Sequence, residues 1–286
     1  MAPLWIVRTA FRTVGNVAPG VAARWAEAIF CRPPRHEARV QDDAFLATGQ
    51  RFSLASDEGT LAAWTWGAGP TILLVHGWGS RAGRFSVLAP ALVAAGFRVV
   101  AHDGPGHGES SGLLASLPQF AHAVRAVAGA LGPVSGVIGH SLGGAAVALA
   151  IWQGLSAERA VLLAAPADVE VFSHRFAQRL AIPPAARLVM QRNLEERFGF
   201  RWPDINVARL AAGMRVPGLV IHDASDADVP LADGQAIAGA WPGAELVTTT
   251  GLGHRGVLWD GEVIRRVVAF IGTQRHAPHP EDQPAG

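Results

Sequence analysis

The sequence predicts an α/β fold: a mostly parallel, doubly wound sheet with helices on both faces and a small helical cap. From about residue 50 to residue 272, short apolar runs of strand length alternate with segments whose apolar residues have helical spacing. A glycine-flanked serine, Ser141, stands directly between one such strand and one such helix. No linker-like segment interrupts the alternation, so one decorated domain is expected.

The elements before Ser141 follow one another closely. Residues 51–66 alternate well enough for two strands that join at residues 57–59. A buried strand at 71–75 leads into His76-Gly77-Trp78-Gly79. The pattern then predicts a helix at 84–95, a strand at 97–101, a glycine-rich loop at 103–110, a helix at 118–131 and a strand at 134–138.

After Ser141 the pattern continues, changes and then resumes. A helix is predicted at 145–152 and a strand at 160–164. The segment from about 168 to 215 lacks strand signals but is rich in helix formers, which predicts an inserted cap. The alternation ends with a strand at 218–222, a helix at 231–240, a strand at 244–249 and a helix at 257–271.

These elements divide the chain into three parts. Residues 1–48 are expected to form an N-terminal helical extension, and residues 49–272 the α/β domain with its cap insertion at about 168–215. Residues 273–286 contain three prolines, and we expect a disordered tail there.

The N-terminal extension has helical apolar spacing over residues 4–14 and 21–30, with arginines interspersed. Its first apolar stretch has four residues and precedes the positive charge, which is the wrong order for a signal peptide. An amphipathic helix of this kind is compatible with weak peripheral membrane contact. No apolar run reaches the roughly twenty residues of a transmembrane helix, so none is predicted.

Composition narrows the class of protein. Of the 286 residues, 50% are hydrophobic and 16% charged, which favours a large core over disorder. The net charge of +1 argues against a nucleic-acid partner. All 24 basic residues are arginines, which we attribute to nucleotide bias and give no functional weight. The single cysteine, Cys31, excludes an intramolecular disulfide, and a cytoplasmic location is expected.

The position of Ser141 predicts a nucleophile. A Gly-x-Ser-x-Gly turn between strand and helix holds its serine in a strained conformation that needs small neighbours and exposes the hydroxyl. The backbone N–H of Leu142, at the start of the helix, would point toward the oxygen that becomes negative when the hydroxyl attacks a carbonyl. An acyl-transfer enzyme without a cofactor is therefore predicted.

The serine needs a base to accept its proton, and histidine is the usual one. In this strand and helix arrangement the partners follow the serine, on loops at the carboxyl ends of later strands. His222, His254, His276 and His279 come late enough. His276 and His279 fall in the proline-rich tail and His222 falls within a strand, which leaves His254.

A carboxylate must orient the histidine and stabilise its protonated form. Three aspartates, Asp223, Asp226 and Asp228, crowd the loop after the strand at 218–222. The chemistry of a carboxylate does not choose among them.

Over about residues 50–272, the chain resembles the α/β-hydrolase superfamily. The resemblance rests on residues 76–79, 139–143, 226–230 and 253–254. It implies that Asp226, in Asp-x-x-Val-Pro, is the acid, with Asp228 as the main rival, and that the N–H of Trp78 joins that of Leu142 in the oxyanion hole. The loop at 103–110 is similar to the superfamily's Asp-x-x-Gly-x-Gly-x-Ser loop, and we expect it to shape the site without reacting.

Metal chemistry is not predicted. His102, Asp103, His107 and Glu109 lie close together, but neither a His-Glu-x-x-His helix nor a cysteine pair accompanies them. His102 and His107 are instead expected to brace loops or to be solvated, as are two further histidines, His76 and His140.

The predicted function is a serine hydrolase that cleaves a carboxylic ester of a small, apolar substrate through an acyl-enzyme, with Ser141, Asp226 and His254 as catalytic residues. Amides, thioesters and lactones use the same machinery. Two alternatives stay open: a cofactor-free perhydrolase, and a binding protein on the same fold with little or no turnover. Eight large apolar cap residues either line an acyl pocket or only pack: Phe172, Phe176, Leu180, Leu188, Met190, Phe198, Phe200 and Trp202.

Overall fold

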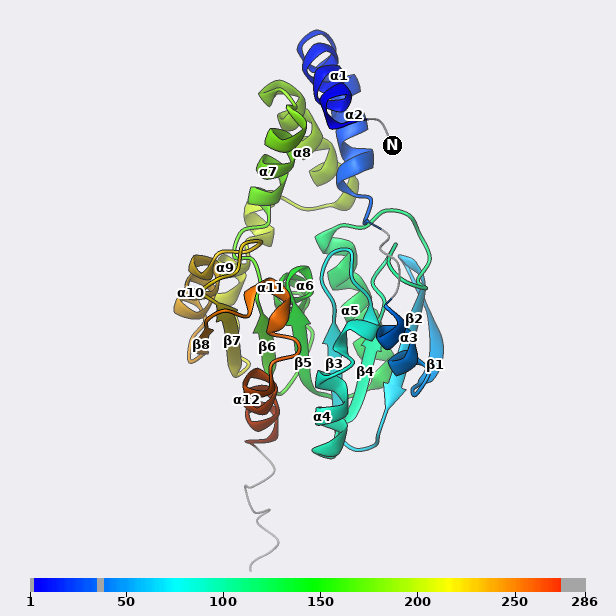
Figure 1. Ribbon diagram of the computed structural model, residues 1–286, viewed down its shortest axis with the longest axis vertical. Coiled ribbons are helices and arrows are strands. Elements are labelled where there is room, and N and C mark those ends of the chain that lie inside the picture. The colour runs from blue at the N-terminus through cyan, green and yellow to red at the C-terminus, as the bar shows by residue number, and fades with distance from the viewer. Residues whose placement is uncertain (1–2, 35–38, 274–286) are drawn as a thin grey trace, which may run out of the picture.

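The computed structural model describes residues 3–34 and 39–273 (Figure 1). Its eight-stranded sheet has the order β1-β2-β4-β3-β5-β6-β7-β8. β2 runs antiparallel to β1 and β4, and the other neighbours are parallel, so the predicted mostly parallel sheet is confirmed. The strands are β1 (Gln50–Ser56), β2 (Gly59–Trp66), β3 (Thr71–Val75), β4 (Arg98–His102), β5 (Val134–His140), β6 (Ala160–Leu163), β7 (Gly218–Asp223) and β8 (Glu245–Thr249).

Helices cover both faces of the sheet, as predicted. Alternate side chains of one strand point to opposite faces, and Leu73 of β3 packs with α5 and α6, whereas Leu74 packs with α4 and α12. The helices are α1 (Leu4–Val17), α2 (Pro19–Phe30), α3 (Val40–Leu46), α4 (Leu88–Ala94), α5 (Leu117–Leu131), α6 (Leu142–Trp152), α7 (Glu170–Leu180), α8 (Pro184–Phe198), α9 (Val207–Ala211), α10 (Leu231–Ala240), α11 (Gly253–Gly256) and α12 (Gly261–Gly272), with 3-10 turns η1 (Ala82–Phe85) and η2 (Trp202–Ile205).

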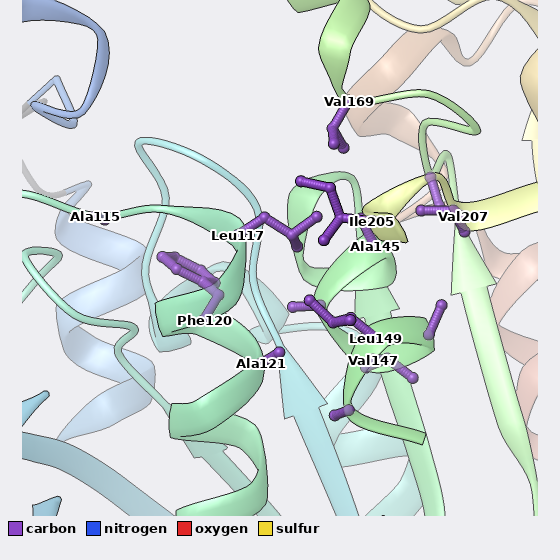
Figure 2. Packing of buried hydrophobic residues seen from close by; sticks show 14 of the residues in the cluster. Ala115, Leu117, Phe120, Ala121, Ala145, Val147, Leu149, Val169, Ile205 and Val207 are labelled. Carbon is purple, nitrogen blue, oxygen red and sulfur yellow. The ribbon is translucent and has the colours of Figure 1, made fainter. Parts of the chain in front are cut away.

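Helix α6, which follows Ser141, lies in the centre of the molecule. Its residues from Gly143 to Ala150 are all buried, as expected for a helix that is apolar on every side. Figure 2 shows Val147 and Leu149 of α6 in the same buried cluster as Leu117 and Ala121 of α5. Fully burying side chains of this size stabilises a fold by roughly 1.5–3 kcal/mol each. The serine is therefore attached to a rigid, well-packed element.

Two predicted helices are wrong in their extent. In place of a helix over 84–95, the chain forms η1 and then α4, which starts late enough to place Pro90 in its first turn, where its missing N–H has no intrahelical partner to lose. In place of a helix over 257–271, the chain forms α11 and α12. The carboxylate of Asp260 accepts the N–H groups of Glu262 and Val263 and so begins α12.

The first two helices pack on the cap segment. Helices α7, α8 and α9 lie within residues 168–215, and α1 and α2 contact α7 and α8 above the sheet (Figure 1). The ring of Phe30 on α2 meets that of Phe176 on α7 edge to face at 5.2 Å. Residues 4–30, which the sequence assigned to an extension, thus contribute to the same layer as the cap. Helix α3 was not predicted.

The structure bears on the predicted tail and on the prediction that no helix spans a membrane. Apart from Thr273, the predicted tail over 273–286 falls outside the described residues. Within residues 3–34 and 39–273, no helix is long and apolar enough to cross a lipid bilayer. At the start of α1, the side chains of Leu4, Trp5 and Ile6 are exposed.

Candidate active site

Ser141 occupies a strained turn between β5 and α6. Its backbone has φ 54° and ψ −124°, a left-handed conformation that is rare for a residue with a side chain. A side chain at Gly139 would collide with the backbone of Gly143, and one at Gly143 would collide with the carbonyl oxygen of Val75. Both glycines are therefore needed for the close approach of α6 to the sheet, which lifts the serine hydroxyl into the open.

The side chains of Ser141, His254 and Asp226 form one continuous hydrogen-bonded chain. His254, in α11, places Nε2 2.9 Å from Oγ of Ser141, while its Nδ1 lies 2.8 Å from Oδ2 of Asp226. Because Nδ1 carries a proton and donates a hydrogen bond to the aspartate, Nε2 is left free to accept the proton of the serine. The structure thus brings together the three residues that the sequence named.

The three aspartates after β7 have different partners. Asp226 turns Oδ2 to His254, and its Oδ1 accepts the N–H groups of Asp228 and Val229. Asp228 is exposed. Geometry therefore selects Asp226 as the carboxylate that orients the histidine.

Asp223 holds the turn that carries His254. Its carboxylate accepts hydrogen bonds from the hydroxyl of Thr249 and the N–H groups of Leu252 and Gly253. Burial on its own would raise the pKa of Asp223, but these hydrogen bonds outweigh burial and lower it. The ionised carboxylate ties the end of β8 to α11.

Two buried histidines hold the loops that carry His254 and Asp226. Nε2 of His140 donates to the carbonyl oxygen of His254 over 2.9 Å, and Nε2 of His222 donates to the carbonyl oxygen of Val229 over 2.9 Å. Burial, aided by nearby His254, lowers the pKa of His140 to about 3, so the ring stays neutral. Neither contact could be predicted from the sequence, in which the position of His140 directly before Ser141 is the available signal.

Two more histidines hold the loop at residues 76–79. The N–H of Gly79 donates to Nε2 of His107, and the N–H of Gly104 donates to Nε2 of His76. Nδ1 of His107 donates to the backbone carbonyl of Pro105, and Nδ1 of His76 donates to that of Gly77. Burial lowers the pKa of His107 to about 4 and that of His76 well below its ordinary value. Both rings stay neutral and can accept these hydrogen bonds.

The loop at 103–110 is organised by Asp103. Its Oδ1 accepts the N–H of Ala82 and its Oδ2 accepts the N–H of Glu109. Burial raises the pKa of this carboxyl to about 6. Both oxygens of Asp103 thus accept backbone N–H groups, and Nε2 of His107 accepts that of Gly79, so these two side chains hold the loops around the site.

Two backbone N–H groups border the serine on the remaining side. Trp78 and Leu142 both line the space in front of Ser141. Within the described part of the chain, neither N–H has a hydrogen-bond acceptor. Leu142 is the first residue of α6, where the N–H is unpaired and the helix dipole favours negative charge. This pair is suited to bind an oxyanion.

Two cavities meet at Ser141 and Trp78. One, of about 360 Å³, lies between α2, α7 and α8, and we call it the apolar cavity. The other, of about 630 Å³, also reaches His254, and we call it the polar cavity. Of the eight large cap residues, five line the apolar cavity: Phe172, Phe176, Phe198, Phe200 and Trp202. Leu180 and Met190 are buried in the core, and Leu188 is exposed.

Comparisons with known proteins agree with this architecture. Residues 68–208 match the family of serine aminopeptidases designated S33. A non-heme haloperoxidase from Rhodococcus erythropolis is 37% identical over 100 residues, which cover 34% of this chain and 36% of that relative. The chain thus matches little more than a third of that relative's length.

Solved structures share the fold over most of their length. An esterase from Pyrococcus furiosus has 20% identity and a TM-score of 0.66, covering 85% of this chain and 98% of that one. A bromoperoxidase from Bacillus anthracis has 19% identity and a TM-score of 0.59, and the match covers 79% of this chain and 100% of that one. An esterase from Rhodococcus sp. has 19% identity and a TM-score of 0.61, and the match covers 78% of this chain and 98% of that one. The chain therefore has the α/β-hydrolase fold.

Proposed function

We propose that this protein is a serine hydrolase that cleaves carboxylic esters with an apolar acyl group. The observation that carries the proposal is the relay from Oγ of Ser141 through His254 to Asp226, with separations of 2.9 and 2.8 Å. Acyl transfer by a serine needs this relay, an oxyanion site and room for the acyl group. All three meet at Ser141.

The proposed cycle has two halves. Oγ of Ser141 attacks the ester carbonyl carbon while Nε2 of His254 takes its proton, and the N–H groups of Trp78 and Leu142 bind the oxyanion. The bond from the carbonyl carbon to the alcohol oxygen breaks, and His254 gives the proton to the departing alcohol. Water then attacks the acyl-enzyme with His254 again as base, which releases the carboxylic acid and restores the serine hydroxyl.

The apolar cavity supports an apolar acyl group as the preferred substrate. Its volume of about 360 Å³ lies within the usual range for ligand sites, and aromatic rings such as Phe176 and Phe198 form much of its wall. The cavity begins at Ser141, so an acyl chain placed in it has its carbonyl carbon at the nucleophile.

Cys31, which also lines the apolar cavity, does not compete with Ser141. Burial raises the pKa of its thiol to about 11, so the reactive thiolate is scarce near neutral pH.

We also propose a cytoplasmic location, because a chain with this single cysteine needs no oxidising compartment. Fractionation of the source cells is the check, and recovery outside the cytoplasm contradicts it.

Peroxide can replace water as the second nucleophile, which makes a perhydrolase the second candidate. The matching relatives named haloperoxidase and bromoperoxidase favour this reaction. Hydrogen peroxide would attack the acyl-enzyme, form a peracid and return a proton to the serine oxygen, with no cofactor. Peracetic acid formed from an acetate ester and hydrogen peroxide at a rate comparable with hydrolysis would support it.

A fluorophosphonate probe tests the proposed function. The parent protein is expected to gain one covalent adduct within minutes, located on Ser141 by mass spectrometry of its peptides, and to hydrolyse p-nitrophenyl butyrate. Ser141→Ala should lose both properties, whereas Ser156→Ala, at an exposed position after α6, should keep both. A parent protein that neither labels nor hydrolyses is a binding protein on this fold, and the proposal is then wrong.

A further inference from the structure

The walls of the two cavities differ in charge. Among the described residues, the charged side chain on the wall of the apolar cavity is Arg32. In the described part of the chain, the wall of the polar cavity has one exposed acid, Asp228, and four arginines: Arg39, Arg84, Arg175 and Arg255. Apart from the catalytic His254, the ionisable groups around this cavity are therefore mainly cationic.

Arg84 lacks a strong carboxylate partner. Its nearest carboxylate in the described part of the chain is that of Asp42, at 3.9 Å from Nε. Nη1 of Arg84 is buried and has no hydrogen-bond partner among the described residues. Burial and the nearby charges of Arg39, Arg255 and Arg81 lower the pKa of Arg84, against the opposing effect of Asp42. A buried N–H group without an acceptor is costly unless a ligand supplies one.

Among the described residues, neither Arg175 nor Arg39 forms an ion pair with a carboxylate. The guanidinium of Arg175 donates to the backbone carbonyl of Asp228 and not to its carboxylate. Arg39 lies over the ring of Trp259 at 5.2 Å, and Arg84 lies over the same ring at 5.9 Å. These contacts fix the positions of the side chains and leave N–H groups for an anion.

The cluster lies where a leaving group would go. Arg255 follows the catalytic His254 directly, and both cavities share Ser141 and Trp78. With an acyl chain in the apolar cavity and its carbonyl carbon at Ser141, the alcohol part of the ester points into the polar cavity. Guanidinium groups bind phosphate and carboxylate groups through paired N–H donors.

We propose that the polar cavity is an anion subsite and that the preferred substrates are apolar acyl esters or thioesters whose alcohol or thiol part carries a phosphate or carboxylate group. This inference rests on the proposed function. The reaction is the same hydrolysis: water cleaves the acyl bond and releases the fatty acid and the intact anionic alcohol or thiol. The anion takes part in binding and forms no bond.

The first experiment compares three esters with the same acyl chain: decanoylglycerol, decanoylglycerol 3-phosphate and decanoylglycerate. We expect kcat/KM to be at least about tenfold higher for the phosphate or the carboxylate ester than for the neutral one, as one charged hydrogen-bonded contact would give. The anionic ester with the higher kcat/KM shows whether the subsite prefers phosphate or carboxylate. The preference should shrink between 50 mM and 500 mM NaCl, because salt screens partly exposed charges. Equal values for all three esters overturn the inference.

Arginine variants locate the subsite. Arg84→Gln and Arg255→Gln should each reduce the ratio of anionic to neutral kcat/KM by about tenfold. Arg266→Gln, at an exposed position on α12 away from the cavity, should leave the ratio and the rates unchanged. The ratio itself is the readout, because general damage to the enzyme lowers both rates together. An unchanged ratio in both cavity variants shows that these arginines do not bind the anion.

A binding measurement separates this inference from the proposed function. Binding of decyl phosphate and of decanol to Ser141→Ala is followed by tryptophan fluorescence, since Trp78 and Trp259 adjoin the site. We expect decyl phosphate to bind at least about tenfold more tightly. This result stands even if the parent protein hydrolyses no ester, in which case the proposed function alone fails. Equal affinities overturn the anion subsite even if esters are hydrolysed.

Discussion

Nδ1 of His254 lies 2.8 Å from Oδ2 of Asp226, whose side chain is fully buried. The second oxygen of this carboxylate is held by two backbone N–H groups, so the aspartate cannot rotate without losing them. The aspartate therefore fixes both the direction of the imidazole ring and the nitrogen that carries the proton.

Asp226→Asn is expected to lower kcat for p-nitrophenyl butyrate by about 10⁴-fold, because an amide N–H facing Nδ1 favours the wrong tautomer. Asp57→Asn, at an exposed turn, should have no effect. A thermal melt of each variant checks that the loss is not unfolding. Retention of more than a tenth of the parent rate by Asp226→Asn would exclude this aspartate as the catalytic acid.

The apolar cavity predicts a dependence on acyl length. Each methylene buried is worth about 0.8 kcal/mol, so kcat/KM for p-nitrophenyl esters should rise about fourfold per methylene from acetate until the cavity is full. Phe176→Ala should weaken this dependence, because it removes part of the wall and the contact with Phe30. Leu188→Ala, at an exposed position on α8, serves as the matched control. Rates that are independent of chain length would show that the cavity does not hold the acyl group.

Gly143 is predicted to be intolerant of any side chain. A methyl group there would collide with the backbone of Val75 and His76, and such overpacking costs about 1–3 kcal/mol or more. Gly143→Ala should therefore lower the free energy of unfolding measured in urea, and should lower activity as well.

Gly129 provides the matched control for Gly143. It lies in helix α5, with open space where a side chain would go. Gly129→Ala should raise the free energy of unfolding by about 0.5–1 kcal/mol, since alanine is the better helix former. Equal effects of the two substitutions would contradict the close approach of α6 to β3.

His102 predicts a loss of stability in acid. At the end of β4 its ring is buried, neither nitrogen has a partner among the described residues, and burial lowers its pKa to about 4. In the unfolded chain the imidazole has a pKa of about 6.5. Between these values the unfolded state binds a proton that the folded state does not. The stabilisation is therefore complete above about pH 6.5 and is lost as the pH falls toward 4.

His102→Leu removes this proton uptake. From pH 8 to pH 5, the parent should lose about 2 kcal/mol more of its unfolding free energy than the variant. Urea titrations at the two pH values measure the difference, and Asp103 and the other buried histidines contribute equally to both proteins. The same pH dependence in parent and variant would mean that His102 is protonated or paired in the folded state.

Much of the strand and helix order could be predicted, because periodicity is a local property of the chain. The runs at 71–75 and 134–138 correspond to β3 and β5, and the glycines around Ser141 mark the turn. Helix ends were harder to predict. The start of α12 depends on one side-chain hydrogen bond from Asp260, which apolar spacing does not reveal.

The site was predicted only as far as the order of its motifs allowed. The chemistry of a carboxylate left Asp223, Asp226 and Asp228 open, because three acids within six residues offer the same functional group. The contacts of His140 and His222 join carbonyl groups 114 and seven residues away, respectively, and neither follows from spacing.

By itself the sequence determined that strands alternate with helices, that Ser141 stands at a strained turn and that His254 and an aspartate follow it. Those properties belong to short segments. Only the tertiary structure decided which aspartate meets His254, that α2 helps to enclose the apolar cavity, and that four arginines without a motif gather at the polar one. These outcomes depend on distances between residues far apart in the chain, and such distances exist only once the core has packed.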